Sequence, residues 1–247
     1  MSNQKKQRAY HKAQLYRLLI RIVDNDNLSD SIFFKGGTCC AMLGYLDRFS
    51  VDLDFDLEKG ADKKGLREEF HKIFADLGLE IKDESKKALQ FFLKYDSPPG
   101  ERNTIKLEVI DNPYESIEYE PQYLEDIDRT VVCQTLESMF ANKLVALIDR
   151  YEKRETIAGR DVYDIHHFFS RGYDYKEGII KERTGKDALS YLRKLKEFIG
   201  DKITQKIIDQ DLNFLLPNEK FQTIRKSLKE ETLMLIAEEI KRINETS

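Results

Sequence analysis

The strictest pattern in the chain is the stretch SVDLDFDL, residues 50–57, in which apolar and acidic residues alternate. Side chains at every second position of a strand point to the same side, so Asp52, Asp54 and Asp56 share one face. The apolar residues between them need cover from other elements, which predicts a place in a packed sheet. Because like charges repel, either water solvates the three aspartates or a cation binds them, and their spacing is consistent with both.

A glycine-rich turn precedes this strand. The apolar run at residues 31–34 predicts a short strand, Gly36 and Gly37 the turn after it, and residues 38–46 a short helix with Thr38 near its N-cap. Backbone N–H groups of such a turn can approach an anion closely, although a plain turn with a helix cap is the commoner meaning of these residues. Beside a strand of carboxylates, the turn predicts a cradle for nucleotide phosphates.

The remaining chain divides into two kinds of pattern. Helical periodicity is present at residues 3–25, 62–77, 136–154 and 159–172, and strand-like runs lie at 79–84, 88–95, 104–110 and 116–124. After Cys133 the pattern becomes one of long helices that continue to the end. We therefore predict an α+β domain over residues 1–132 and a helical domain over residues 133–247.

Composition excludes several classes of protein. No apolar run approaches the roughly 20 residues that span a bilayer, so no membrane partner is expected. Three cysteines without C-x-x-C spacing predict neither a disulfide framework nor a zinc site, which favours a reducing cytoplasm. The net charge of −4 does not indicate a general nucleic-acid binder, but it leaves room for a local basic patch.

The stretch KGGTCCAMLGYLDRFSVDLDF, residues 35–55, resembles the signature of the AbiEii/AbiGii-type toxins, a branch of the DNA polymerase β-like nucleotidyltransferase superfamily. The matching residues are Lys35, Gly36, Gly37 and Thr38, then Arg48 with Ser50, and then Asp52 with Asp54. At two helix positions where the family usually has small or aliphatic residues, this chain has Cys39 and Cys40. This difference affects the packing of the helix and not the chemistry. The resemblance implies an α+β fold with a polymerase β-like mixed sheet, flanking helices and a helical C-terminal half.

A third acidic group is expected on a neighbouring strand, because two-metal nucleotidyl transfer usually requires one. In TIKLEVI, residues 104–110, alternation places Glu108 on the polar face with Lys106. Glu108 could accept the hydroxyl proton or complete a metal site, and an ordinary exposed glutamate fits the pattern equally well. Resemblance to the third carboxylate of the superfamily favours Glu108, with Asp111 as the alternative if the register differs.

The helical half contains a second matching stretch. Lys143 lies on one predicted helix, and Arg160, Asp161 and Asp164 form an Arg-Asp-x-x-Asp start on the next. Most helix lysines are solvated, and acids are favoured at any helix start. The resemblance implies that Lys143 and Asp161 complete the active site, with Lys143 reaching a triphosphate and Asp161 orienting Lys143 or the acceptor.

The resemblance implies a complete enzyme. Two magnesium ions would be held by Asp52, Asp54 and Glu108, and the substrate would be an NTP. The residues implied in nucleotide binding are Lys35, Gly36, Gly37, Thr38, Arg48, Ser50 and Lys143. The family consists of toxins of type IV toxin–antitoxin systems, associated with phage defence, so a separate antitoxin is the expected partner. Some members add nucleotides to tRNA 3′ ends, which makes tRNA the expected acceptor.

Three other functions remain open at this stage. The hydroxyl acceptor could belong to a small molecule, as in enzymes that inactivate aminoglycosides, or to a protein. The non-enzymatic alternative is a degenerate NTP-binding module. An idle site has no physical need for a repulsive pair such as Asp52 and Asp54, which argues against that alternative.

Overall fold

The computed structural model describes residues 3–246, and these divide into two compact units. The sheet unit comprises the chain up to Gly44, Phe49–Pro113 and Tyr119–Gln134. The helical unit comprises Tyr45–Arg48, Tyr114–Glu118 and the chain from Thr135 onward. Two short segments from the first half of the chain therefore belong to the helical unit, which no sequence pattern predicted.

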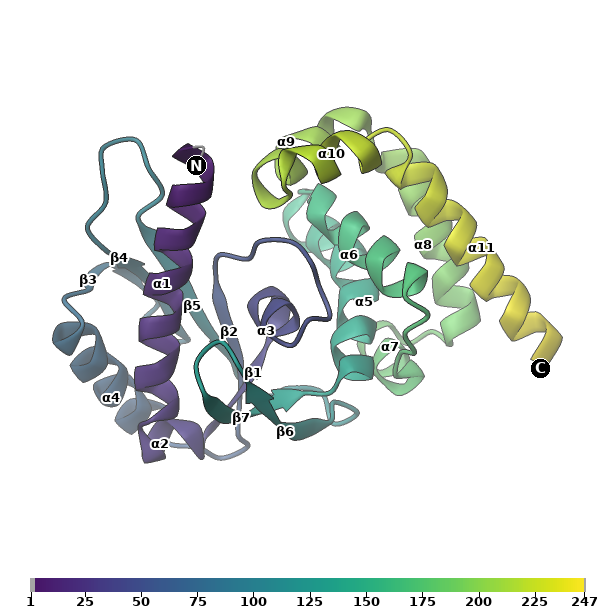
Figure 1. Ribbon diagram of the computed structural model, residues 1–247. Coiled ribbons are helices and arrows are strands. Elements are labelled where there is room, and N and C mark those ends of the chain that lie inside the picture. The colour runs from purple at the N-terminus through teal and green to yellow at the C-terminus, as the bar shows by residue number, and fades with distance from the viewer. Residues whose placement is uncertain (1–2, 247) are drawn as a thin grey trace. The chain divides into compact units, whose positions relative to one another are not determined.

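The sheet unit begins with helices and strands interspersed and continues, after α4, with five consecutive strands (Figure 1). Its strands are β1 (Ile32–Lys35), β2 (Leu53–Leu57), β3 (Glu80–Glu84), β4 (Leu89–Lys94), β5 (Thr104–Ile110), β6 (Tyr119–Leu124) and β7 (Arg129–Gln134). Its helices are α1 (Asn3–Val23), α2 (Asp26–Ser29), α3 (Gly36–Met42) and α4 (Lys63–Asp76). Helices α1 and α4 contact each other, and α3 contacts β1 and β2.

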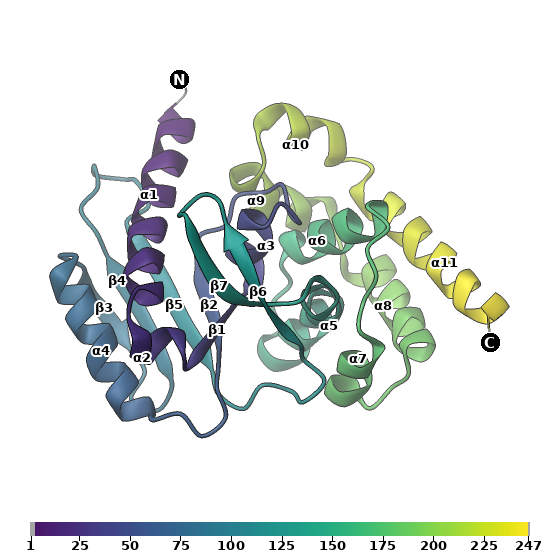
Figure 2. The same ribbon diagram turned by 60° about the horizontal axis from the view of Figure 1, so that its bottom comes forward.

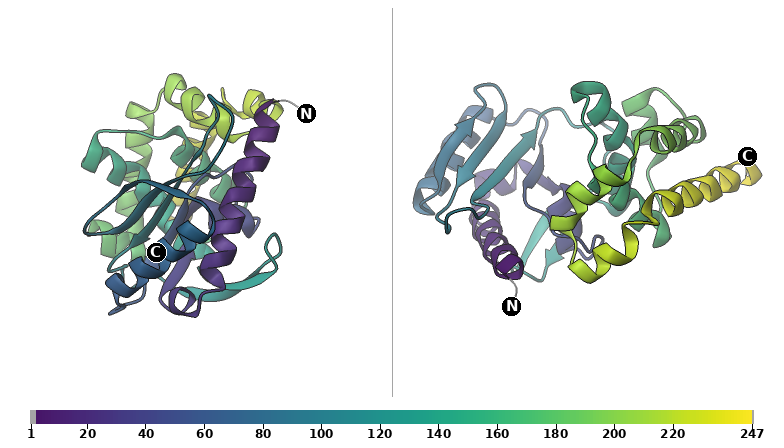
Figure 3. Two further views of the ribbon diagram at one scale, coloured as in Figure 1. Left: turned by 90° about the vertical axis from the view of Figure 1, so that its left-hand side faces the viewer. Right: turned by 90° about the horizontal axis from the view of Figure 1, so that it is seen from above.

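The strands of the described chain form one mixed sheet in the order β3-β4-β5-β2-β1-β7-β6, with β3, β4 and β5 side by side (Figure 3). Strand β2 pairs antiparallel with β1 and parallel with β5. The alternation predicted for β5 is confirmed, because Ile105, Leu107 and Val109 are buried. Leu53 and Phe55 of β2 are also buried, so the apolar face of the aspartate strand lies in the core.

Three local predictions differ from the structure. Strand β2 begins at Leu53, so Asp52 lies in the segment before it. Helix α3 begins at Gly36 and ends at Met42, and Lys35 rather than Thr38 occupies the N-cap. The glycine turn and the first turn of the helix are thus the same residues. Strand β7 was not predicted as a strand of its own, and it pairs antiparallel with β6 and parallel with β1.

The helical unit is built from the second half of the chain. Its helices are α5 (Leu136–Arg154), α6 (Gly159–Ser170), α7 (Glu177–Thr184), α8 (Ala188–Lys202), α9 (Gln205–Leu215), α10 (Asn218–Ile224) and α11 (Leu228–Thr246). Helix α6 contacts α5, α9 and α11, and α11 also packs along α8 (Figure 2). None of the helices described in residues 3–246 is long and apolar enough to cross a membrane.

Gly159, at the start of α6, allows close packing of that helix against α9. A Cβ atom there would lie 2.7 Å from the backbone oxygen of Ile207, whereas a Cβ at Gly200 of α8 would meet nothing within 4 Å. We predict that Gly159→Ala destabilises the protein by about 1–3 kcal/mol, because backbone atoms must move. Gly200→Ala, the matched control, should stabilise it by about 0.5–1 kcal/mol. Urea unfolding measures the change in the free energy of unfolding of each variant. Equal changes in the two variants would contradict the close packing at Gly159.

Candidate active site

Asp52 and Asp54 are half-buried carboxylates at the start of β2. Within residues 3–246 neither side chain takes part in a hydrogen bond or an ion pair. Burial and the neighbouring Asp52 raise the pKa of Asp54 to about 6, although Lys106 and Lys35 act in the opposite direction. Two adjacent carboxylates without a partner are costly, so this position favours a cation.

Asp56, the third aspartate of the strand, has a different environment. It is fully buried, and its carboxylate forms an ion pair with Lys35 of β1. The Tyr119 hydroxyl donates to it at 2.9 Å, and the Gln134 side-chain amide donates to the same oxygen. Asp56 is therefore a structural residue, and Lys35, which the resemblance implied in nucleotide binding, has this carboxylate as its partner.

The glycine turn lies directly against Asp54. Lys35 is the cross-strand partner of Asp54, and Gly36 follows it with a left-handed φ of 81°. A Cβ atom on Gly36 would lie 2.5 Å from Asp54 Oδ2, so only glycine fits there. The Thr38 hydroxyl donates to the Asp52 backbone oxygen at 2.5 Å and ties the turn to the segment that carries Asp52. The turn and the two carboxylates thus form one local arrangement.

Glu108 is next to Asp54 across the parallel pair of β2 and β5. Lys106 donates to Glu108 Oε2 at 2.5 Å, and the Gln90 side-chain amide of β4 donates to Oε1. The structure thus places Glu108 on a strand next to Asp54, as was expected for a third acidic group. Asp111, the alternative, is exposed and forms an ion pair with Lys63 at 2.6 Å.

In the helical unit a buried carboxylate brings two predicted residues together. Asp164 of α6 is fully buried and accepts from Arg48 Nη2 at 2.7 Å and from Lys143 Nζ at 2.8 Å. Although burial opposes it, Arg48 and Lys143 hold the pKa of Asp164 well below its ordinary value. Arg48 lies in Tyr45–Arg48, the loop segment that belongs to the helical unit.

Asp161, the predicted residue one turn before Asp164, has a separate partner. Its carboxylate accepts from Arg150 Nε at 2.9 Å, and it is buried at the start of α6. The acid that contacts Lys143 is therefore Asp164, which sequence reasoning assigned only to the helix start. The sequence could not show which of the two acids contacts Lys143, because Asp161 and Asp164 both lie near the same end of the helix. Ser50 is half-buried in the segment before β2.

The donor set of the sheet unit is suited to a hard divalent cation, since it consists of carboxylate oxygens. Asp52 and Asp54 have no competing partner among the described residues, so they fit this group as they stand. In residues 3–246 no three His, Cys, Asp or Glu side chains are already gathered around a metal position. Both oxygens of Glu108 accept hydrogen bonds, one from Lys106 and one from Gln90.

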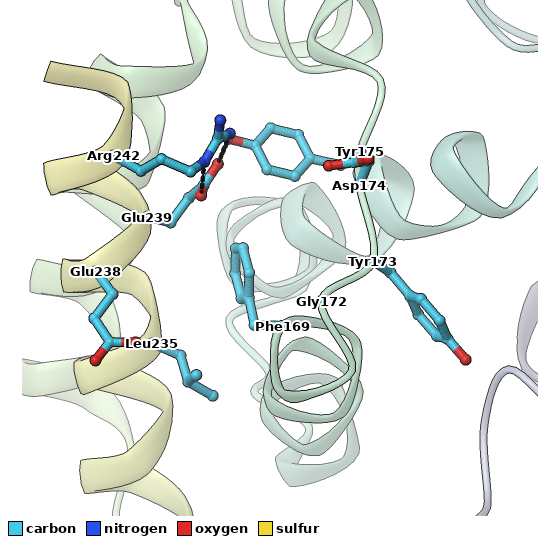
Figure 4. A pocket seen from close by; sticks show the side chains of 9 residues that line it. All are labelled: Phe169, Gly172, Tyr173, Asp174, Tyr175, Leu235, Glu238, Glu239 and Arg242. Carbon is cyan, nitrogen blue, oxygen red and sulfur yellow. Dashed lines mark hydrogen bonds and ion pairs between the residues drawn. The ribbon is translucent and has the colours of Figure 1, made fainter. Parts of the chain in front are cut away.

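A separate cavity of about 430 Å³ lies within the helical unit (Figure 4). Its walls come from the end of α6, the following loop and α11. They include Phe169, Tyr175, Glu239 and Arg242, with Arg242 and Tyr175 both bound to Glu239. None of the residues predicted from the sequence lines this cavity. It provides no support for the predicted chemistry.

A family model identifies the protein family of the chain that carries the glycine turn and the carboxylates. The model of the nucleotidyl transferase AbiEii toxin of type IV toxin–antitoxin systems matches residues 17–234. The chain is a member of the AbiEii family. It is therefore a nucleotidyltransferase of the toxin class, and its family implies an NTP substrate and an antitoxin partner. The match includes both the sheet unit residues and the helical residues discussed above.

Solved structures support the fold of this AbiEii protein. A putative nucleotidyltransferase from H. pylori is 22% identical, with a TM-score of 0.56, and the match covers 98% of this chain and 99% of that one. The nucleotidyltransferase toxin MenT4 from Mycobacterium tuberculosis is 16% identical, with a TM-score of 0.55, and the match covers 97% of this chain and 88% of that one. A search of curated proteins gave no match. The predicted mixed sheet and helical C-terminal half are confirmed.

Sequence reasoning missed two charged residues, one in each unit. Lys106 was recognised only as a neighbour of Glu108 on the polar face of β5, although it forms an ion pair with that residue. Asp164 was recognised only as part of a helix start, although two cations bind it. An ion pair two residues apart on one strand could have been inferred for Lys106. The partners of Asp164 lie far away in sequence, so no local pattern contains them.

The close approach of Gly36 to Asp54 can be tested against Gly44, which has a similar φ of 74° and no atom within 4 Å of an added Cβ. We predict that both Gly→Ala variants lose about 1–2 kcal/mol, because both backbones are left-handed. Only Gly36→Ala should also displace Asp54 and abolish nucleotidyl transfer. Urea unfolding and a transfer assay measure the two effects. Full transfer by a folded Gly36→Ala protein would contradict the arrangement.

Proposed function

We propose that this AbiEii protein transfers an NMP group from an NTP to the 3′ hydroxyl of a tRNA in a magnesium-dependent reaction. The observation that supports the chemistry best is the pair of unpartnered carboxylates, Asp52 and Asp54, with Glu108 beside them across the β2–β5 pair. A protein that pairs Asp56 and Asp164 with cations leaves these two acids without one. Such a cost is common where a ligand supplies the missing charge.

The residues of the sheet unit have different roles in the proposed reaction. When bound, magnesium ions held by Asp52, Asp54 and Glu108 would neutralise phosphate charge and lower the pKa of the acceptor hydroxyl. The turn of Gly36, Gly37 and Thr38 approaches the β- and γ-phosphates of the nucleotide. Glu108 takes the hydroxyl proton, the hydroxyl oxygen bonds to the α-phosphorus, and the bond to the β-phosphate breaks, which releases pyrophosphate.

The biological setting follows from the family. The AbiEii description names a toxin of a type IV toxin–antitoxin system, which fits an enzyme that modifies a component needed for growth. We propose tRNA as that component, with action in the cytoplasm and a role in phage defence. The reaction requires an acceptor hydroxyl, and the 3′ end of a tRNA carries one.

The proposal is tested by label transfer from each of four α-labelled NTPs to total bacterial tRNA in the presence of magnesium. We expect label on tRNA, and a loss of about 1,000-fold in Asp52→Asn and Asp54→Asn proteins that still fold. Asp111→Asn is the matched control, because Asp111 is an exposed acid of the same unit. It should retain full transfer.

Other outcomes distinguish the parts of the proposal. Label that moves to protein or to a small molecule would overturn the RNA acceptor and leave the enzyme class intact. Full transfer by either Asp→Asn protein would overturn the metal assignment. Denaturing gels separate labelled RNA from labelled protein, so one experiment reports both.

Lys143 is tested within the helical unit. We predict that Lys143→Met lowers transfer by about 100-fold, because a cation proposed to offset triphosphate charge is removed. The fold should survive, since Arg48 remains bound to Asp164. Lys153→Met, on the exposed part of the same helix, is the control and should leave transfer unchanged. Equal activity of the two variants would remove Lys143 from the proposed machinery.

A further inference from the structure

Lys106 is a cation among the proposed metal ligands. It lies two residues before Glu108 on β5, so both side chains project from the same face of the sheet. Glu108 is in turn the cross-strand neighbour of Asp54. A lysine on this face places one positive charge beside carboxylates that the proposed function assigns to divalent ions.

The ion pair between Lys106 and Glu108 differs from an ordinary surface pair of the same sheet. The Lys106 and Glu108 side chains are 24% and 22% exposed, whereas those of Lys94 and Glu80 are 44% and 68% exposed. A less exposed pair is less screened by water and interacts more strongly. The Nζ–Oε2 distance of 2.5 Å places the ammonium directly on one of the two Glu108 oxygens that could hold a metal.

The second oxygen of Glu108 is also engaged, by the side-chain amide of Gln90. An amide donor is neutral and can turn away at little electrostatic cost, whereas the ammonium carries a charge that repels a metal. Lys106 also acts on Asp54, since it lowers the pKa of that carboxyl against the effects of burial and Asp52. Its charge thus reaches both strands of the proposed metal site.

We propose that Lys106 is an internal counter-ion that competes with the divalent metal for Glu108, so that metal binding displaces its ammonium. The inference rests on the metal assignment made under the proposed function. Removing the charge while keeping an unbranched side chain should therefore tighten metal binding. Lys106 sets the metal affinity of the site without holding the metal itself.

The test is a titration of the full-length protein with Mn²⁺ alone, followed by the electron paramagnetic resonance signal of free Mn²⁺. We expect Lys106→Met to bind Mn²⁺ about ten-fold more tightly than the natural sequence, because one nearby like charge is removed. Lys82→Met is the matched control, since Lys82 is an exposed lysine on β3 of the same sheet. Its affinity should stay within about two-fold of the natural protein, as expected for an exposed and screened charge.

A double variant locates the effect at Glu108. Glu108→Gln should weaken Mn²⁺ binding, and adding Lys106→Met to it should tighten binding clearly less than Lys106→Met does alone, because the Glu108 oxygen for which the two cations compete is no longer charged and only the effect on Asp54 remains. Lys106→Gln provides a second variant if Lys106→Met does not fold, and its affinity should rise in the same direction. Thermal unfolding establishes that each variant is folded.

Unchanged or weaker Mn²⁺ binding in folded Lys106→Met would overturn the competition, and weaker binding would make Lys106 a residue that positions Glu108. A different result would affect only the inference about Lys106. In that case the natural protein binds Mn²⁺, Asp54→Asn abolishes the binding, and Lys106→Met leaves the Mn²⁺ affinity unchanged. If the natural protein does not bind Mn²⁺, or Asp54→Asn binds it equally well, the metal assignment of the proposed function fails too.

Discussion

The sheet unit depends on how it accommodates the buried carboxylate of Asp56. An isolated buried charge costs several kcal/mol, and removing one partner of a buried pair costs about 3–5 kcal/mol. Lys35, Tyr119 and Gln134 supply the donors, and they come from β1, β6 and β7. The carboxylate therefore requires these three strands to be in place around β2. The same ion pair holds the end of β1, and Gly36 follows it directly against Asp54.

In both units, buried carboxylates are paired with positively charged side chains. In the helical unit Asp164 is neutralised by Arg48 and Lys143, and Asp161 by Arg150. These pairs satisfy the charge with groups of the protein itself. Asp54 of β2 is an exception, since Lys106 and Lys35 act on it without bonding to it, and Asp52, just before the strand, has no bonded partner among the described residues either. Within residues 3–246 these two carboxylates of this AbiEii enzyme lack a bonded cation, and the proposed function assigns that role to a metal-bound substrate.

Most of the fold could be predicted because its elements carry strong local patterns. Alternation defined β5 to the residue, and periodicity defined α5 from Leu136 to Arg154. Strand β7 pairs with β6, which directly precedes it, and also with β1, which lies far away in the chain, and no local pattern contains that second pairing. The loop segment that contains Arg48 was also beyond reach, since its place in the helical unit depends on Asp164, which is 116 residues away.

The sequence by itself determined the class of chemistry, because the order Lys-Gly-Gly-Thr, Arg-x-Ser and Asp-x-Asp is a local property of the chain. It also determined that Glu108 shares a polar strand face with Lys106. Only the tertiary structure decided which charges meet: Lys35 with Asp56, and Lys143 with Asp164. The reason is physical, since an ion pair depends on which strands and helices become neighbours, and that choice is made by the packing of the whole core.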